Sequence, residues 1–485
     1  MEVKNLARQE LWSNFSNLNA IPRASKKEER VIAFMMAFGQ QLGLETVCDR
    51  TGNVVIKKNA TAGMENRKTV VLQSHLDMVH QKNGDTDFDF DVQGIEMLVE
   101  GDWVRANGTT LGADNGIGVA AIMALLASDT IVHPALEAMF TIDEETGMTG
   151  AMQLDPANFS GTILLNLDTE EDDELTIGCA GGIDTNTFYA YSLEPVAEDS
   201  AAFTISIKGL MGGHSGMDIH KGRGNANKLI NRLFYGALKS FALQLNSVDG
   251  GSLRNAIPRE ATAVVVVPGS QKDAFVAYCN VFALTLKDEY HTIESSLILT
   301  VTETVLPQQV MGKADFIRIV NAIYALPNGV FRMSPDIDNL VEASTNLARV
   351  IVKNGEFITQ SLQRSSVEST KDDVANAVSA AFENMGCSVT QGGDYPGWKP
   401  DPDSDILRLM VKLYHSNFGK EPKVEACHAG LECGILGAHF PVMDMISFGP
   451  TIHGAHSPDE CVQISSVQKF WGFLTSVLKE IPVKE

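Results

Sequence analysis

A histidine and an aspartate stand two residues apart at the end of a short apolar segment, Val70–Met78 (VVLQSHLDM). In extended backbone, side chains at i and i+2 point to the same side, so His75 and Asp77 would face one cleft beyond that strand. A neutral imidazole is a good zinc ligand, and a neighbouring carboxylate can fix its tautomer. Taken alone, a histidine at a strand end is more often a hydrogen-bonded structural residue, so the metal hypothesis needs support from other segments.

Two further apolar segments end in acidic side chains. Residues 135–142 lead into Asp143-Glu144-Glu145, and residues 162–167 lead into Asp168. Adjacent acids repel one another unless a positive charge lies nearby, although a solvated loop would also accommodate them. In an open α/β sheet, ligands bind beyond the carboxyl ends of the strands, so these acids and His75 are predicted to converge on a metal site.

Asp114 lies in a glycine-rich segment, GTTLGADNGIG at 108–118, which leads into an apolar helical segment at 119–127. An aspartate at such a place is commonly a helix N-cap. The alternative is that Asp114 is a metal ligand and that the glycines allow an unusual turn. Its position in the chain, between the other candidate segments, favours ligation.

Histidine and carboxylate ligands together suit Zn²⁺, with Co²⁺ or Mn²⁺ as substitutes. Two divalent cations that share a water lower its pKa from about 15.7 towards about 7. A carboxylate that is not itself a ligand must then take the proton and pass it to the leaving group. Of the adjacent Glu144 and Glu145, one can ligate and the other can act as the base, and the residues alone do not say which.

The length of 485 residues predicts two domains. Apolar strand segments alternate with helical ones in residues 1–186 and again in 396–485, which predicts one discontinuous α/β domain with a largely parallel central sheet flanked by helices. Residues 187–395 have a different, α+β pattern and are predicted to form an inserted domain. Ser25 and Glu28 have the S-x-x-E spacing of a capping box, which predicts that the second helix opens there.

The formal net charge of −23 argues against nucleic acid or an anionic membrane as a partner. The seven cysteines are scattered without a CxxC pair, which fits reduced thiols better than a disulfide framework. The N-terminal segment lacks the continuous apolar stretch of a signal peptide, and no run reaches membrane-spanning length. These features predict a cytoplasmic protein.

Three later segments carry further candidates. His214 lies in a GGHSG turn, residues 428–434 read HAGLECG, and the loop GPTIHGAHSPDE at 449–460 offers both His453 and His456. Each has an ordinary structural explanation, because GGHSG also makes a good turn and the cysteines around the second segment are more often buried thiols than metal ligands.

Eight motifs occur along the chain in a fixed order. They are SHLDMV at 74–79, GADNG at 112–116, DEETG at 143–147, LD at 167–168, GGHSG at 212–216, RNAIPR at 254–259, HAGLECG at 428–434 and GAHSPDE at 454–460. In this order they resemble the dinuclear-zinc aminopeptidase/carboxypeptidase superfamily that includes aminoacylase-like enzymes and carnosinases. The resemblance spans nearly the whole chain.

The resemblance implies two zinc ions and assigns each site residue a role. One zinc would be held by His75, Asp114 and Asp168, and the other by Asp114, Glu145 and His456, with Asp114 bridging. Asp77 would hydrogen-bond His75, and Glu144 would be the general base on the water that bridges the metals. Substrate would be bound by His214, which helps to stabilise the oxyanion from its own chain or from a partner subunit, and by Asn255, Arg364 and Gly430.

The activity that the resemblance implies is hydrolysis of unsubstituted dipeptides, with preference for a C-terminal histidine, including β-alanyl-histidine (carnosine). A homodimer formed through the inserted domain, which would also act as a lid, belongs to the same expectation. An N-acyl amino-acid deacylase and a tripeptidase are alternatives with the same chemistry. A catalytically inactive peptide-binding protein is the alternative of another class, and the intact Glu144 speaks against it.

Overall fold

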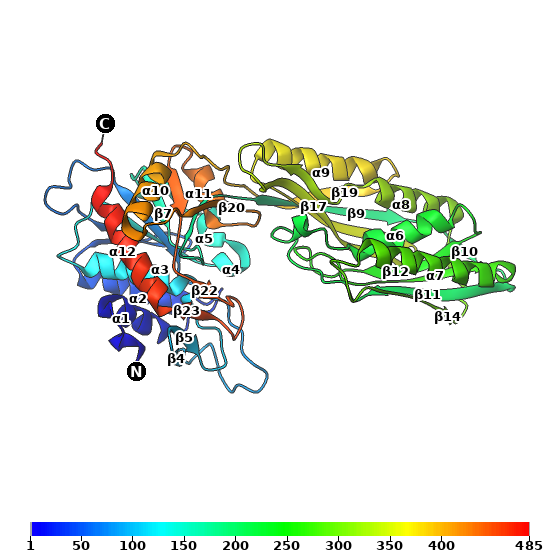
Figure 1. Ribbon diagram of the computed structural model, residues 1–485, viewed down its shortest axis with the longest axis horizontal. Coiled ribbons are helices and arrows are strands. Elements are labelled where there is room, and N and C mark those ends of the chain that lie inside the picture. Colours follow the sequence, from blue (N-terminus) through cyan, green and yellow to red (C-terminus); the bar gives the residue numbers. More distant parts are fainter. Residues whose placement is uncertain (1, 485) are drawn as a thin grey trace. The chain divides into compact units, whose positions relative to one another are not determined.

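The computed structural model describes residues 2–484, which divide into two compact units (Figure 1). Unit 1 takes the described residues of Met1–Gly178, Trp398–Ala426 and Leu431–Glu485, and unit 2 is Cys179–Gly397 with Cys427–Gly430. The predicted boundaries lie after residues 186 and 395, with the short segment 427–430 in the first domain. None of the helices in residues 2–484 has both the length and the apolar character of a membrane span.

The main sheet of unit 1 has the strand order β1-β2-β6-β3-β7-β21-β8-β20. Its strands are β1 (Glu45–Cys48), β2 (Val54–Lys58), β3 (Val70–His75), β6 (Leu136–Thr141), β7 (Ile163–Asn166), β8 (Glu174–Cys179), β20 (Lys423–Cys427) and β21 (Asp444–Ser447). The pairs β6–β3, β3–β7 and β7–β21 are parallel, whereas β1–β2, β2–β6 and β21–β8 are antiparallel. The predicted α/β fold with a largely parallel centre is confirmed.

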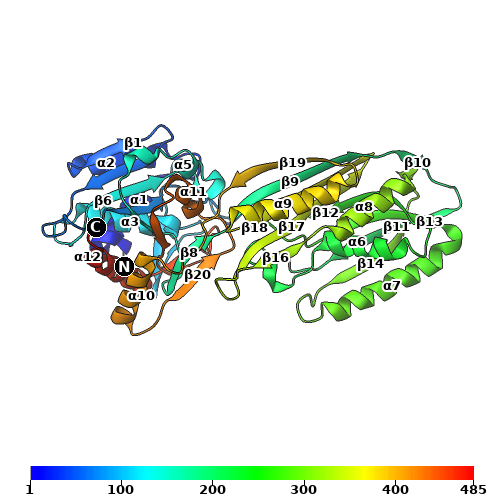
Figure 2. The same cartoon turned by 90° about the horizontal axis from the view of Figure 1, so that it is seen from above.

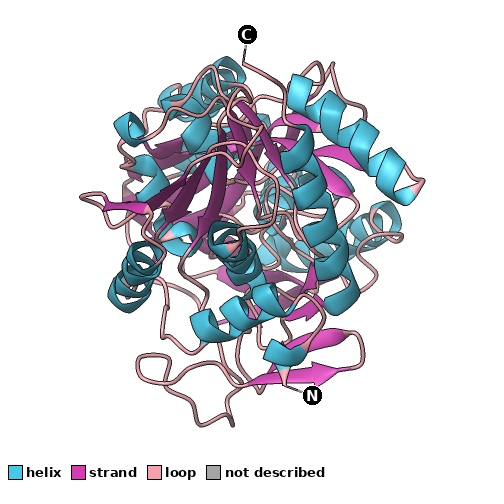
Figure 3. Ribbon diagram, turned by 90° about the vertical axis from the view of Figure 1, so that its left-hand side faces the viewer, coloured by secondary structure: helices cyan, strands magenta, loops and turns pink. Residues whose placement is uncertain are grey.

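Strands β3, β6 and β7 are buried along their whole length. Continuous apolar strands of this kind are typical of a sheet covered on both faces, and Figure 3 shows helices surrounding the sheet of unit 1. The helices of unit 1 are α1 (Gln9–Asn19), α2 (Glu29–Gln41), α3 (Ala113–Ala127), α4 (Glu144–Gly147), α5 (Thr149–Met152), α10 (Asp405–Phe418), α11 (Glu432–His439) and α12 (Ile464–Glu480). Because the central strands share one direction, their carboxyl ends bring the candidate ligands to one edge of the sheet.

The glycines around Asp114 allow a turn that a regular helix start could not make. Gly112 has φ +70°, and a Cβ added there would lie 2.5 Å from a guanidinium nitrogen of Arg23. Asp114 and Asn115 have non-helical backbone angles and are joined by a cis peptide bond, so regular helix begins only after them. The Asp114 side chain does not cap the helix, and the N-cap alternative is therefore wrong.

A smaller sheet of unit 1 carries the loop that contains His456. Its strand order is β22-β23-β5-β4. The strands are β4 (Met97–Glu100), β5 (Trp103–Ala106), β22 (Ile452–His453) and β23 (Cys461–Gln463). β22 and β23 pair antiparallel, so residues 454–460 form the connecting loop.

Unit 2 is built on an antiparallel sheet with the order β14-β11-β13-β12-β17-β18-β9-β19, and β16 pairs with β17 beside this path. The strands are β9 (Gly181–Ala190), β11 (Ser200–Lys208), β12 (Gln244–Gly250), β13 (Ala261–Pro268), β14 (Ile298–Thr304), β16 (Gly329–Met333), β17 (Val341–Lys353), β18 (Glu356–Ser365) and β19 (Ser388–Tyr395). Four helices lie over the sheet in Figure 2: α6 (Ala226–Ala237), α7 (Lys272–Glu289), α8 (Lys313–Ala325) and α9 (Glu368–Glu383). Their apolar faces and the strands share one buried core, which includes Phe203, Phe234, Phe275 and Phe316.

The predicted capping box at Ser25 and Glu28 is wrong. Helix α2 begins at Glu29, and its N-cap residue Glu28 makes no side-chain capping bond. The Ser25 hydroxyl instead donates to the Met78 carbonyl oxygen at 3.2 Å, and the Glu28 carboxylate accepts from the Lys26 backbone N–H at 2.8 Å. This segment therefore holds the chain against the loop that follows β3.

Candidate metal centre and substrate-binding residues

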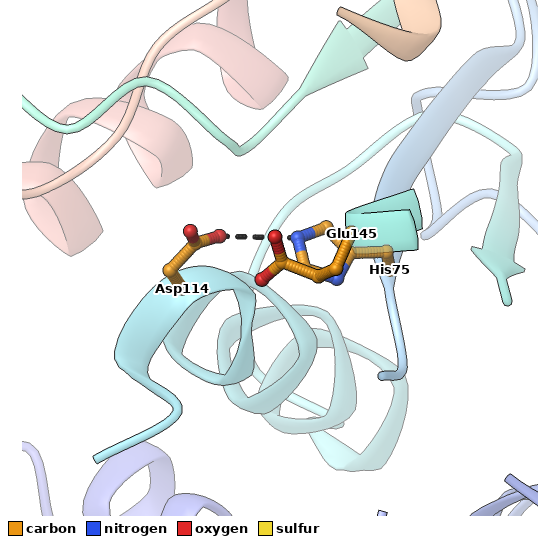
Figure 4. Close-up of side chains that lie close together, drawn as sticks. All are labelled: His75, Asp114 and Glu145. Atoms are coloured by element: carbon orange, nitrogen blue, oxygen red, sulfur yellow. Dashed lines mark hydrogen bonds and ion pairs between the residues drawn. The ribbon is translucent and has the colours of Figure 1, made fainter. Parts of the chain in front are cut away.

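His75 lies in a cluster of carboxylates in unit 1. Its side chain is 1% exposed, and its Nε2 lies 3.1 Å from Asp114 Oδ1 and 3.5 Å from Asp168 Oδ1. On the other side of the ring, Nδ1 lies 3.2 Å from the Asp77 carbonyl oxygen and 3.4 Å from Asp77 Oδ1. Figure 4 shows His75, Asp114 and Glu145 pointing toward one another. With a proton on Nδ1, Nε2 is left as the atom that can ligate a cation.

The two carboxylate oxygens of Asp114 face different partners. Oδ1 faces His75, whereas Oδ2 lies 3.2 Å from His456 Nε2. His456 Nε2 is in turn 3.0 Å from Glu145 Oε2. Asp114 therefore lies between two donor sets, one made by His75 and Asp168 and the other by His456 and Glu145. A carboxylate that bridges two cations needs this arrangement.

Asp77 connects His75 to both adjacent glutamates. Its Oδ1 accepts from the Glu144 backbone N–H at 3.0 Å, and its Oδ2 accepts from the Glu145 backbone N–H at 3.3 Å. The side chain is fully buried, so these contacts are shielded from water. Asp77 thus fixes the start of α4 against the end of β3.

Burial and repulsion among the carboxylates favour their protonated forms. Burial raises the pKa of Glu144 well above its ordinary value, and the charge of Asp168 adds to the shift. Burial is also the largest cause of the raised pKa of Asp168 and of Glu145. Burial alone would lower the pKa of His75, but the charge of Asp168 and the contact with Asp114 raise it well above its ordinary value. A divalent cation would neutralise this cluster without protons.

The donor set fits a divalent cation. His75, Asp114 and Glu145 each offer a ligand atom, and these atoms lie within 4.8 Å of one another. Glu145 Oε1 is buried and has no hydrogen-bond partner among residues 2–484. Imidazole nitrogen together with carboxylate oxygens is the mixed set that zinc and related cations bind.

The structure separates the two histidines of the 454–460 region. His456 belongs to the cluster, as its contacts with Asp114 and Glu145 show. His453 lies 5.0 Å from Trp103 between ring centroids, and its Nε2 is 3.8 Å from a Glu171 oxygen. The expectation that His456 rather than His453 faces the acidic cluster agrees with this geometry.

Sequence reasoning missed a row of polar side chains that crosses the parallel strands. Gln73 donates to Glu432 Oε2 at 2.6 Å, Asn166 donates to the Gln73 side-chain oxygen, and Ser447 donates to the Asn166 side-chain oxygen. Gln73 and Asn166 each precede a residue of the cluster by two positions and therefore share its side of the strand. Polar residues at that spacing in otherwise apolar strands were the signal that could have revealed the row.

Glu432 ends this row and was also missed. It is 1% exposed, its Oε2 accepts from Gln73 and from the Thr141 hydroxyl at 2.7 Å, and its Oε1 lacks a partner in the described part of the chain. Burial raises the pKa of Glu432 to about 8. Burial, with the charges of Asp114 and Asp168, likewise raises the pKa of Glu170 to about 8.

In unit 2, the hydrogen bonds of His214 define its tautomer. Its Nδ1 accepts from the backbone N–H groups of Gly216 at 3.2 Å and Met217 at 3.1 Å, so this nitrogen carries no proton. Burial and the positive charge of Arg364 lower the pKa of His214 to about 4. At neutral pH the ring is therefore uncharged, with Nε2–H as its donor.

Arg364 lies on β18 and is 5% exposed, unlike the surface arginine that a strand position usually implies. Its Nη1 donates to the Tyr395 hydroxyl at 2.8 Å, and its Nε is buried without an acceptor from the described residues. Gly182 pairs with Arg364 across the sheet, and a Cβ there would lie 2.7 Å from the Tyr395 ring. A buried guanidinium with an unused donor suits an incoming carboxylate.

The loops of Asn255 and Gly430 also belong to unit 2. The Ser215 N–H donates to the Asn255 carbonyl oxygen at 2.8 Å, which joins the Asn255 loop to the His214 loop. The 427–430 segment packs against the same turn, because a Cβ at Gly216 would lie 1.9 Å from the His428 carbonyl oxygen.

These contacts assemble His214, Arg364 and the two loops from a single chain.

The fold and the donor set define a class of metal-dependent hydrolases: a parallel-centred α/β unit with histidine and carboxylates at its strand ends, interrupted by an α+β unit. The chain belongs to the peptidase family M20/M25/M40, whose model matches residues 71–480.

Relatives match along the full length. The chain is 42% identical over 486 residues to the cytosol non-specific dipeptidase of Escherichia coli (strain K12), covering 100% of both chains. It also matches the crystal structure of aminoacylhistidine dipeptidase from Vibrio alginolyticus with a TM-score of 0.94 and 43% identity, covering 100% of this chain and 99% of the other. The aminopeptidase PepT structure from Bacillus cereus shares the fold at a TM-score of 0.57 and 15% identity, covering 98% and 99%.

The raised pKa of Glu432 predicts a pH-dependent effect on stability. Between its ordinary pKa of 4.5 and about 8, the native state keeps a proton that the unfolded state loses, so its contribution to stability falls as pH rises through this window. Glu432→Gln should remove this dependence. In urea unfolding of metal-stripped protein, the variant should gain stability relative to the unchanged chain from pH 5 to pH 8.

The matched control is Glu480→Gln, at an exposed glutamate at the end of α12. Its unfolding curve should follow that of the unchanged chain at each pH. If the free energy of unfolding of Glu432→Gln depended on pH in the same way as that of the unchanged chain, this result would contradict the raised pKa of Glu432.

Proposed function

We propose that the chain is a metal-dependent dipeptidase, with unit 1 as its catalytic domain and unit 2 as its inserted lid and dimerisation domain. The observation that carries the proposal is the position of Asp114 between two donor sets, with Glu144 held next to Glu145 by the bond from its backbone N–H to Asp77. Family membership and full-length identity to a relative named as a dipeptidase support it.

The proposed cofactor is a pair of divalent cations, zinc ions with Co²⁺ or Mn²⁺ as substitutes. His75, Asp114 and Asp168 would hold one, and Asp114, Glu145 and His456 the other. When bound, the cations would lower the pKa of water and polarise the carbonyl of the scissile peptide bond. The mixed imidazole and carboxylate donors and the unsatisfied oxygen of Glu145 support this assignment.

Glu144 is the proposed general base. Its backbone N–H is held by Asp77, and burial gives its carboxyl group a raised pKa, which suits a group that must take a proton and release it again. Glu144 would accept the proton of the attacking water and deliver it to the leaving amine. Asp77 would orient His75 and keep both glutamates in place.

Residues of unit 2 are proposed to bind the dipeptide. Arg364, oriented by the Tyr395 hydroxyl, would pair with the terminal carboxylate of the substrate. His214 would donate its Nε2–H to the oxyanion that forms from the scissile carbonyl. Asn255 and the Gly430 loop would complete the contacts with substrate.

The proposed substrates are unsubstituted dipeptides, with preference for a C-terminal histidine. The name of the Vibrio alginolyticus relative supports the histidine preference, whereas the Escherichia coli relative is named as non-specific. We also propose a cytoplasmic location, which is supported by the word cytosol in the name of the Escherichia coli relative and by the scattered cysteines of the sequence.

A homodimer is proposed through unit 2. Strand β14 lies at one end of the sheet order of that unit, and Ile298 on it is 56% exposed. Helix α7, which packs beside β14, leaves Val281 64% and Leu284 68% exposed. An open strand edge next to an apolar helix face suits antiparallel pairing with the same strand of a second copy.

Replacing Glu144 tests the catalytic role. Glu144→Gln should lower kcat by about 10²–10⁴-fold, because the proton transfer loses its base. Metal content measured by mass spectrometry should stay at the level of the unchanged chain, whereas Glu145→Gln should lower it. Full turnover in a metal-loaded Glu144→Gln protein would remove the assignment.

A substrate panel tests the specificity. Zinc-restored protein should hydrolyse carnosine and other Xaa-His dipeptides, and should be poor with N-acetyl amino acids, tripeptides and C-terminal amides. Arg364→Lys should raise KM for dipeptides about tenfold or more, because the planar two-donor contact is lost. Faster hydrolysis of N-acetyl amino acids or tripeptides would favour those alternatives, and metal-loaded protein inert toward the whole panel would indicate a binding protein.

The oligomeric state is tested by measuring the molar mass with light scattering as the protein elutes from a size-exclusion column. The unchanged chain should have twice the mass of one chain, and Val281→Glu with Leu284→Glu should give a monomer. Val442→Glu, at a 90% exposed valine of unit 1, is the control and should stay dimeric. A monomeric unchanged chain would refute the proposal.

A further inference from the structure

Glu460 makes an unusual set of contacts with the turn that presents Asp114. Its Oε2 accepts from the backbone N–H groups of Leu111 at 2.7 Å and Gly112 at 2.9 Å. Its Oε1 accepts from those of Ala113 at 2.7 Å and Asp114 at 3.2 Å. One carboxylate thus satisfies four consecutive amides, and we call residues 111–114 the Asp114 turn.

The turn itself offers these four amides no hydrogen-bond acceptor. The backbone at Asp114 and Asn115 is non-helical, so the regular hydrogen-bond ladder of α3 starts only later. Amides at a helix start need external acceptors, and an anionic acceptor makes the strongest bonds. Glu460 is 2% exposed, which excludes water as the competing acceptor.

Arg23 donates a hydrogen bond to a backbone carbonyl group of the same turn. It is 1% exposed, and its Nη2 donates to the Gly112 carbonyl oxygen at 2.5 Å. Its Nη1 donates at 3.0 Å to the carbonyl oxygens of Leu76 and Asp77, directly after His75. The Asp114 turn is therefore tied to the end of β3 as well as to Glu460.

The contacts of Glu460 matter because of where this residue lies in the chain. It stands four positions after His456 in the loop between β22 and β23, more than three hundred residues after the Asp114 turn. The His456 side chain is 58% exposed, so surrounding packing does little to hold it. Glu460 ties the far end of the same loop to the turn that carries Asp114.

We propose that Glu460 is a positioning residue that preforms the second cation site by locking the His456 loop to the Asp114 turn. The proposal rests on the proposed metal centre, in which Asp114, Glu145 and His456 share that cation. Glu460 itself binds neither metal nor substrate in this assignment. Its effect should fall mainly on the cation that His456 helps to hold. The cation of His75, Asp114 and Asp168 should be affected much less, because Arg23 still ties the Asp114 turn to the end of β3.

The test is cobalt titration of metal-stripped protein, followed by calorimetry and by the visible absorption of bound Co²⁺. The unchanged chain should bind two equivalents. In Glu460→Gln the amide nitrogen cannot accept, so two of the four amides lose their partner. The second equivalent should then bind about tenfold to a hundredfold more weakly, the range seen when outer residues of a metal site are removed, while the first changes little.

Two further variants separate positioning from loss of folding. Asp459→Asn makes the same chemical change at the neighbouring exposed residue and should titrate like the unchanged chain. Glu460→Asp keeps both acceptor oxygens on a shorter arm, and its second-site affinity should lie between those of the unchanged chain and Glu460→Gln. Excess Co²⁺ should restore dipeptide hydrolysis in either Glu460 variant, because the missing factor is occupancy.

The outcomes are distinct. Two tight equivalents in both Glu460→Gln and Glu460→Asp would overturn the positioning role. Equal weakening of both cations, together with a lowered unfolding midpoint of the metal-stripped protein, would also overturn it in favour of a general structural role. Fewer than two equivalents in the unchanged chain would instead count against the proposed dinuclear centre.

Discussion

The structure depends on a concentration of negative charge at the carboxyl edge of a parallel sheet. Asp77, Asp114, Glu145 and Asp168 approach two imidazoles in a largely buried place. Such a cluster is unfavourable by itself, because burial removes water and like charges repel. The chain offsets part of this cost with hydrogen-bond donors, because Asp77 accepts from two backbone N–H groups and Asp168 accepts from the Asn115 side-chain amide. The donor set can also take a cation.

Backbone geometry rather than side-chain packing provides much of this support. Asp77 receives the amides of Glu144 and Glu145, and Glu460 receives the four amides of the Asp114 turn. Each contact joins a segment that carries a candidate ligand to another segment distant in the chain. The candidate ligands are thus placed by hydrogen bonds between loops, and the sheet supplies the rigid base on which those loops start.

The parallel centre and the cluster of histidine and carboxylate side chains could be predicted from the sequence, because the carboxyl ends of parallel strands meet at one edge of a sheet. We could therefore recognise the apolar segments of β3, β6 and β7, and the acidic residues that follow them, from the sequence. The roles of Glu460 and Arg23 could not be recognised, because their partners are backbone groups, which leave no pattern of side chains in the sequence. Ser25 and Glu28 misled for a related reason: their spacing matched a helix cap, but a tertiary contact to Met78 took the hydroxyl.

The interruption of unit 1 by unit 2 has a consequence for synthesis on the ribosome. Strands β3, β6 and β7 emerge early, but β21, which pairs with β7, and the loop with His456 and Glu460 emerge only after the whole of unit 2. Until then the nascent sheet has an open edge, and the amides of the Asp114 turn lack their acceptor. Peptide-cleaving capacity therefore arises last, when the final segment of the chain closes the unit that the first segment began.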